Sequence, residues 1–216
     1  RNLVRRAIER YQIQTYRSVD PEKPFLLWRH DVDFSLKQAL RLAEIEAGEG
    51  LRSTYFLHPH AESYNLLGHR EGTCVQRILD CGHDIGLLFD THYHRIEDET
   101  DLEHALDRER TLLKRWFDTA VSAFSFHNPD SRALSFDSWM YAGMINTYAS
   151  FFQETVAYCS DSHGYWYHDR LDEAIDELPP TDTHGGERTI KNVDLATVLT
   201  EVAELTQPAP QAPATR

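Results

Sequence analysis

Apolar and polar positions along the chain follow two periods, one typical of strands and one of helices. Short apolar or β-branched runs predict five strands, at 25–28, 53–57, 85–89, 121–126 and 155–159. Between them, apolar side chains recur every three or four residues, which predicts helices. One helix starts at Ser35, a second, short helix ends before Gly82, and two more cover 102–116 and 194–205. Because parallel neighbouring strands require a crossover helix, this alternation predicts an α/β fold with a parallel sheet or barrel.

Local signals support these elements. Ser35 can cap a helix, and Gln38 stands three residues later to complete a capping box. Asp194 is the expected cap of the final helix. Trp28 and Trp116 lie in apolar stripes, so we expect both in the core.

Composition excludes several function classes. The chain has 216 residues and a formal charge of -13, which repels phosphate backbones and anionic lipid and argues against a nucleic-acid partner. No apolar run approaches the ~18 residues of a membrane span. Three cysteines without metal-ligand spacing favour reduced thiols and a cytoplasmic location. We expect a single domain over 1–206 and a tail rich in Pro and Ala over 207–216.

Titratable residues follow the expected strands. In parallel barrels the functional site forms just beyond the carboxyl ends of the strands. Five consecutive strands are followed there by His or Asp, namely His30-Asp31-Val32-Asp33, then His58 and His60, then Asp90, His92 and His94, then His127, and then Asp161 and His163. We therefore expect these side chains to gather at one edge of the barrel.

The Asp31-Val32-Asp33 triplet suggests a division of labour. One carboxylate can hold a divalent metal while the other takes a proton from the water that the metal activates. As an alternative, Asp33 caps the helix that begins near Ser35. His92 offers an imidazole of the kind that zinc prefers, and His127 is a candidate metal ligand or general acid.

These motifs resemble those of the polysaccharide deacetylase, or NodB-homology, family, in a branch whose first motif reads His-Asp-Val-Asp. The similarity runs from about residue 25 to 166. It rests on six segments in order, 30–33, 53–56, 64–65, 82–86, 125–127 and 160–162, with Trp166 behind the last. The resemblance implies a distorted, incomplete (β/α) barrel of parallel strands. It also implies metal-dependent removal of an acyl group from the amide nitrogen of a sugar, within bacterial surface-polysaccharide metabolism such as O-antigen or capsule biosynthesis.

The resemblance also implies roles for single residues. Asp31 matches the general base and Asp33 a ligand of the divalent metal, with zinc expected. Of the two histidines that complete the family's metal site, the second matches His92, whereas Leu88 stands where the first would be. We assign His127 to catalysis. The remaining candidates, which would bind the substrate, are His30, His58, Asp161 and Trp166.

Leu88 leaves three alternatives, because leucine cannot ligate a metal. His127, His94 or His58 supplies the missing nitrogen in a rearranged site, or Asp33 and His92 alone bind the metal weakly, or catalysis has been lost. The sequence also leaves three functions open, namely a deacetylase of an acylated sugar or polysaccharide, an inactive domain that binds carbohydrate, and an interaction module with a vestigial site.

Overall fold

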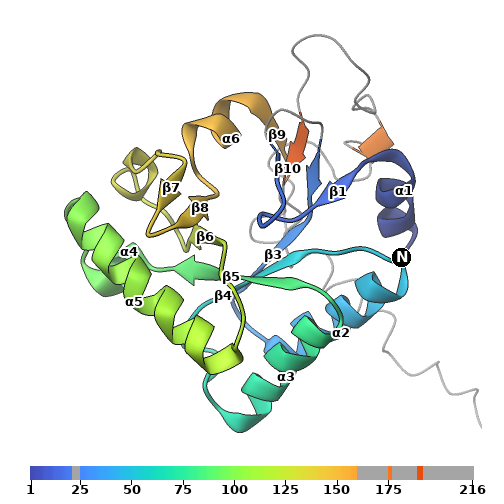
Figure 1. Ribbon diagram of the computed structural model, residues 1–216, viewed down its shortest axis with the longest axis horizontal. Helices are drawn as coiled ribbons and strands as arrows, with labels where there is room; N and C mark the ends of the chain where they lie inside the picture. Colours follow the sequence, from blue (N-terminus) through green and yellow to red (C-terminus); the bar gives the residue numbers. More distant parts are fainter. Residues whose placement is uncertain (21–24, 160–174, 177–188, 192–216) are drawn as a thin grey trace, which may run out of the picture.

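The strands of this protein curve around an open barrel with helices on the outside (Figure 1). The computed structural model describes residues 1–20, 25–159, 175–176 and 189–191. Within them, ten strands form two sheets, ordered β3-β4-β5-β6-β8-β7 and β1-β2-β10-β9. The fold class is therefore α/β with a distorted, incomplete barrel, as the sequence predicts.

The elements alternate along the chain, as expected for crossover connections. The described α-helices are α1 (Asn2–Arg10), α2 (Leu36–Gly48), α3 (His69–Asp80), α4 (Thr91–His94), α5 (Glu99–Phe117) and α6 (Ser150–Thr155). The strands of the larger sheet are β3 (Arg29–Val32), β4 (Thr54–Leu57), β5 (Asp84–Phe89), β6 (Ala123–Phe126), β7 (Met140–Tyr141) and β8 (Met144–Asn146). Those of the smaller sheet are β1 (Ile13–Gln14), β2 (Leu26–Leu27), β9 (Val156–Tyr158) and β10 (Thr189–Lys191).

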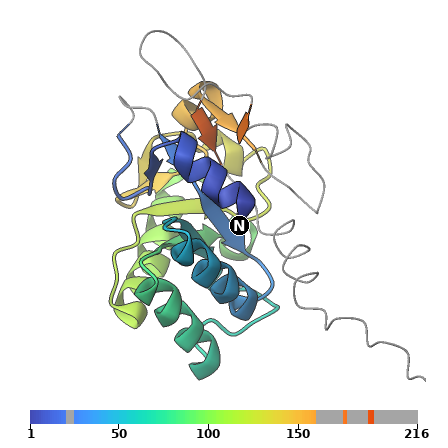
Figure 2. The same ribbon diagram turned by 90° about the vertical axis from the view of Figure 1, so that its right-hand side faces the viewer.

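Strands β3, β4, β5, β6 and β8 run parallel, and β7 closes the edge as an antiparallel partner of β8. The smaller sheet is parallel throughout. Only Trp28 separates β2 from β3, so one stretch of chain passes from the smaller sheet into the larger. This passage joins the two sheets into one curved wall, and Figure 2 shows α1 and α2 lying in front of it.

The two faces of the larger sheet pack differently. Its outer face lies against α2, α3 and α5, where Val32, Leu57, Phe89 and Phe126 join the main apolar core (Figure 1). Its inner face carries the alternate residues, because side chains in a strand point to opposite sides in turn. There Phe56 and Leu88 pack with side chains of the smaller sheet and α6 in a second core.

Helix ends are set by the expected chemistry. The Ser35 hydroxyl accepts a hydrogen bond from the Gln38 backbone N–H at 3.3 Å, which caps α2. The capping box is only half formed, since the Gln38 side-chain oxygen is buried without a hydrogen-bond partner. Gly82 follows α3 with φ +89°, a conformation that glycine adopts without strain.

Two sequence expectations need correction. The first strand does not end at residue 28: β3 continues to Val32, so His30 and Asp31 lie within a strand and on opposite faces of it. Trp116 is 55% exposed on the solvent side of α5, so its placement in the core was wrong, whereas Trp28 is buried as predicted. An apolar residue at helical spacing can lie at the border of the buried stripe, and Trp116 does.

Several elements have no counterpart in the sequence predictions, among them α1, β1, α4, the β7–β8 hairpin, α6 and β10. The expected helix over 194–205 and the tail over 207–216 lie outside the described residues. No described helix combines the length and apolar character that crossing a membrane would require.

Candidate metal centre

Four titratable side chains follow the ends of four neighbouring parallel strands. Asp33 follows β3, His58 follows β4, Asp90 follows β5 and His127 follows β6. The register aligns Val32 with Leu57, and Phe89 with Phe126. It therefore places Asp33 beside His58 and Asp90 beside His127, at what we call the carboxyl rim.

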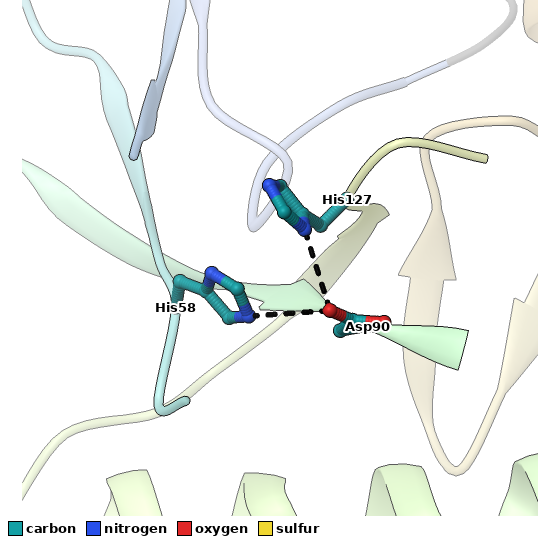
Figure 3. Close-up of side chains that lie close together, drawn as sticks. All are labelled: His58, Asp90 and His127. Atoms are coloured by element: carbon teal, nitrogen blue, oxygen red, sulfur yellow. Dashed lines mark ion pairs between the residues drawn. The ribbon is translucent and has the colours of Figure 1, made fainter. Parts of the chain in front are cut away.

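Three of these residues form a compact donor cluster (Figure 3). His58 Nε2 lies 3.9 Å from Asp90 Oδ2, and His127 Nδ1 lies 3.5 Å from the same oxygen. The three ligand atoms lie within 4.8 Å of one another. Two imidazoles and one carboxylate are a ligand set that catalytic zinc sites use. The side chains present therefore fit a divalent metal.

Asp90 is held in place by the start of the helix that follows it. Its Oδ1 accepts hydrogen bonds from the backbone N–H groups of His92 and Tyr93, at 2.8 and 3.0 Å. Partial burial acts to raise the pKa of Asp90, but these amides and His127 outweigh it and lower the pKa below its ordinary value. Capping thus uses one oxygen and leaves Oδ2, ionised, to face the two imidazoles.

His58 is kept neutral by its surroundings. Its pKa is lowered to about 4, mainly by burial and then by the neighbouring His127, while Asp90 acts in the opposite direction. Its Nε2 is buried and has no hydrogen-bond partner. A neutral imidazole with an unpartnered buried nitrogen is the state in which histidine binds a metal.

Asp33 stands on the other side of His127. The Asp33 Oδ1 atom lies 3.7 Å from His127 Nε2, and that oxygen is buried without a hydrogen-bond partner. The pKa of Asp33 is raised to about 7, mainly by burial and then by the Asp31 carboxylate, while Arg29 opposes the rise. The structure thus brings Asp33 and His127 together, with one nitrogen of His127 toward Asp33 and the other toward Asp90.

Asp31 is bound to a buried arginine. Arg29 Nη2 donates to both oxygens of Asp31 at 2.5 Å, and Arg29 Nε donates to Oδ1 at 3.1 Å. Ser125 contacts both members of this ion pair. Its hydroxyl accepts a hydrogen bond from Arg29 Nη2 at 2.5 Å and donates to Asp31 Oδ2 at 3.4 Å. A guanidinium bound in this way fixes the orientation of a carboxylate.

The arginine needs room inside the barrel, and a glycine provides it. The Arg29 guanidinium carbon lies 4.4 Å from the centre of the Phe56 ring, a cation–π contact. That ring occupies the space a side chain at Gly86 would fill, since a Cβ there would lie 2.5 Å from Phe56. Gly86 therefore lets Phe56 and Arg29 stack behind Asp31.

His30 is not at the carboxyl rim. It is fully buried on the outer face, where its Nε2 lies 2.7 Å from Glu46 Oε1. Trp28 Nε1 donates to the same oxygen at 2.9 Å, while the Ser53 and Tyr55 hydroxyls donate to Glu46 Oε2. Because β3 extends to Val32, His30 faces the helices and cannot contact a substrate at the rim.

His92 does not meet Asp33 in this structure. Its side chain is 61% exposed and its Nε2 lies 4.0 Å from Asp130. It lines a separate hollow with Arg95, Asp130 and Arg132. Leu88 is buried in the inner core, on the same face as His58 and Asp90. Asp161 and Trp166, two of the expected substrate contacts, lie outside the described residues.

Sequence reasoning did not assign roles to Arg29, Asp90 and Ser125. The alternation of β3 held a signal, since Arg29, Asp31 and Asp33 are spaced by two and so share a face. Ser125 likewise precedes His127 by two residues at the end of β6. Asp90 directly follows β5, but which neighbours it meets depends on sheet order.

No protein-family model matches the chain, and no curated protein matches it. Several solved structures are similar at low identity. A family 4 carbohydrate esterase pseudoenzyme from Bacillus anthracis is 13% identical, with a TM-score of 0.48 over 87% of this chain and 63% of its own. The family 4 esterase domain of a multidomain xylanase from the hindgut metagenome of Trinervitermes trinervoides is 9% identical, with a TM-score of 0.48 over 85% and 84% of the two chains.

A chitin deacetylase from the fungal pathogen Colletotrichum lindemuthianum is 13% identical, with a TM-score of 0.48 over 82% of this chain and 76% of its own. This chain spans less than two thirds of the length of the pseudoenzyme. Similarity at this level carries no argument about activity. The function has to be argued from the chain's own side chains.

Proposed function

We propose that this protein is a metal-dependent deacetylase of an N-acylated sugar whose metal site is rearranged around Leu88. The observation that carries the proposal is the cluster of His58, Asp90 and His127 at the carboxyl rim, next to two further carboxylates. Of the three alternatives that the sequence leaves open, this cluster favours the first, in which other histidines supply the missing ligand.

The metal ligands in this proposal are His58 Nε2, Asp90 Oδ2 and His127 Nδ1. When bound, a divalent ion such as zinc polarises the amide carbonyl and lowers the pKa of the attacking water. His58 is already neutral and Asp90 already ionised, which is the state of each that such an ion requires. Leu88 then needs no ligand role and serves the inner core.

Asp33 is assigned to orient His127. In this structure His127 Nε2 lies 3.1 Å from the Asn128 side-chain amide and 3.7 Å from Asp33 Oδ1. With Nδ1 bound to a metal, Nε2 would carry the proton and the Asp33 carboxylate would be its acceptor. A carboxylate behind a ligating histidine fixes its tautomer and ring orientation. The sequence-based role of Asp33 as a direct ligand therefore becomes a supporting one, and His127 becomes a ligand instead of a general acid.

Asp31 keeps the role of general base in this proposal. The salt bridge with Arg29 fixes its carboxylate on the inner face, on the same side as the cluster. Asp31 takes a proton from the attacking water, and that proton is then available to the amine nitrogen as the C–N bond breaks. No second acid is needed, because one proton leaves the water and one reaches the amine.

The substrate class rests on the resemblance of the sequence motifs. An N-acylated sugar or polysaccharide is the substrate that the resemblance implies, and a cytoplasmic site of action in surface-polysaccharide metabolism stays a prediction.

Elemental analysis of protein purified without chelators or an affinity tag tests the metal, and acetate release from chitooligosaccharides tests the reaction. We expect bound zinc and acetate release, with the release lost in Asp31→Asn and the zinc equivalent held by the His58–Asp90–His127 cluster lost in His127→Ala. Ser125→Ala is the matched control, because it alters a contact of Asp31 without removing a proton acceptor. Binding of the sugar with no acetate release and no metal would instead identify an inactive carbohydrate-binding domain.

A further inference from the structure

A second group of metal-ligating side chains lies on the helix side of the sheet. His60 stands three residues beyond β4, His94 ends α4, and Glu109 lies near the middle of α5. His94 Nε2 lies 2.6 Å from Glu109 Oε1, and His60 Nε2 contacts the same oxygen. Three segments that are separate in the sequence thus bring two imidazoles onto one carboxylate.

Glu109 is unusual in where it lies. It belongs to the buried face of α5, together with Leu102, Leu106 and Leu113, and its side chain is 6% exposed. Burying a carboxylate among apolar side chains is costly unless its oxygens are satisfied. Its Oε2 is buried and has no hydrogen-bond partner. The carboxylate therefore points an unsatisfied acceptor into an otherwise apolar contact region.

Both imidazoles are fixed by aromatic neighbours. The His60 ring stacks on Tyr93 with centroids 3.6 Å apart, and the His94 ring stacks on Phe89 at 5.0 Å. Ligands held in this way lose little conformational freedom when an ion arrives. His60 remains 26% exposed, which gives the group a route to solvent.

We propose that His60, His94 and Glu109 form a second site for a divalent transition-metal ion such as Zn²⁺, distinct from the His58–Asp90–His127 cluster. The ligand atoms lie within 4.8 Å of one another, and two imidazoles with one carboxylate suit zinc. An ion there would use the unsatisfied carboxylate and tie the segment after β4 and the end of α4 to α5. The site is structural in character, because its carboxylate lies in the main core.

Metal titration separates this site from the proposed catalytic one. Zn²⁺ is titrated by calorimetry into the chelator-stripped full chain, and Co²⁺ is titrated with absorption spectra that report tetrahedral ligation. We expect two equivalents for the parent protein. His60→Asn should lose one of them, with the affinity of that site falling by more than roughly a hundredfold, since losing a group that merely orients a ligand already costs about 10- to 100-fold.

Two controls keep the test decisive. His104→Asn changes an exposed histidine on α5 and should bind like the parent. His127→Ala should lose the other equivalent and keep this one. His60 lies near the surface, so His60→Asn avoids the loss of folding that a Glu109 variant risks.

Unchanged stoichiometry and affinity in His60→Asn would overturn the second site. His60 and His94 would then act only as hydrogen-bond donors to Glu109. Loss of a zinc equivalent in His127→Ala but not in His60→Asn would support the proposed function and contradict the second site. The reverse result would keep the second site and remove the metal from the proposed function.

Discussion

Two carboxylates on opposite faces of the larger sheet, Glu46 and Asp33, have opposite surroundings. On the outer face, Glu46 is fully buried and its two oxygens contact Trp28, His30, Ser53 and Tyr55. On the inner face, Asp33 keeps a buried oxygen without a hydrogen bond. The pKa values of the two carboxyls shift in opposite directions. Burial acts to raise the pKa of Glu46, but His30 and the other partners outweigh it and lower the pKa below its ordinary value. Burial raises the pKa of Asp33.

This difference separates a structural polar group from a candidate functional one. A satisfied network stabilises a unique core, whereas an unsatisfied buried group needs an explanation, such as an absent ligand. His30 and His127 illustrate the point. The sequence predicts both histidines at the end of a strand. The Glu46 Oε1 atom that faces His30 also accepts a hydrogen bond from Trp28, whereas the Asp33 Oδ1 atom that faces His127 has no hydrogen-bond partner.

The largest effect is expected on the inner face, at the proposed base. Asp31→Asn should reduce deacetylation by roughly 10²- to 10⁴-fold, because asparagine cannot accept the water proton. It should also lower the free energy of unfolding, since buried Arg29 loses its ionic partner while the metal ligands are untouched. Steady-state acetate release measured beside zinc content checks this. Activity within a few-fold of the parent would mean that Asp31 is not the base.

On the outer face, the expected effect is on stability alone. Glu46→Gln should lower the free energy of unfolding by about 3 kcal/mol, because the amide can no longer accept from donors on both sides. Metal binding and activity of the folded protein should stay unchanged. Urea unfolding followed by tryptophan fluorescence, together with zinc titration, measures both. A change in metal affinity would show that the two faces are not independent.

The sequence was a good guide to the scaffold and a weaker one to the site. The strands at β4, β5 and β6 and the long helix α5 were predicted because their apolar periodicity is local information. The short strands β1 and β7 were not, since two residues carry no period and their pairing comes from the rest of the sheet.

The position of a side chain at the rim depends on where the strand ends. Because β3 continues to Val32, His30 lies on the helix side of the sheet and Asp31 on its inner face. His58 and Asp90 met because of sheet order and register, which no single segment reveals. The resemblance of the sequence motifs predicts His92 as a ligand, but its Nε2 lies 4.0 Å from Asp130.

Leu88 offers a finer test of the inner face. If His58, Asp90 and His127 already supply three ligands, Leu88→His should change the zinc dissociation constant by less than about tenfold. It should also reduce stability, because it places a polar ring among Phe56 and its apolar neighbours. Calorimetry on the parent and variant measures the first effect. A large gain in affinity would show that the parent site lacks a ligand, and that Leu88 is where it is missing.

The smallest expected effect is a pH dependence that belongs to Asp33. Its pKa is raised from 3.8 to about 7 in the folded protein, so in the metal-free state folding penalises its ionised form. The unfolded chain loses this proton near its ordinary pKa, and the folded chain holds it up to about pH 7. The contribution of Asp33 to stability therefore falls as the pH rises from about 4 to about 7.

Asp33→Asn removes that titration. Relative to the parent, the variant should gain stability over the same pH range, by about 1 kcal/mol once solvent screening of this partly exposed side chain is allowed for. Unfolding in urea at pH 4, 5.5 and 7.5, with chelator present, measures the difference between the two proteins, and the titrations that they share cancel. The Glu46 network is intact in both proteins and cannot produce this difference. A gap between parent and variant that does not change with pH would mean that the Asp33 carboxyl is as well satisfied as that of Glu46, and the contrast between the two faces would fail at its most specific point.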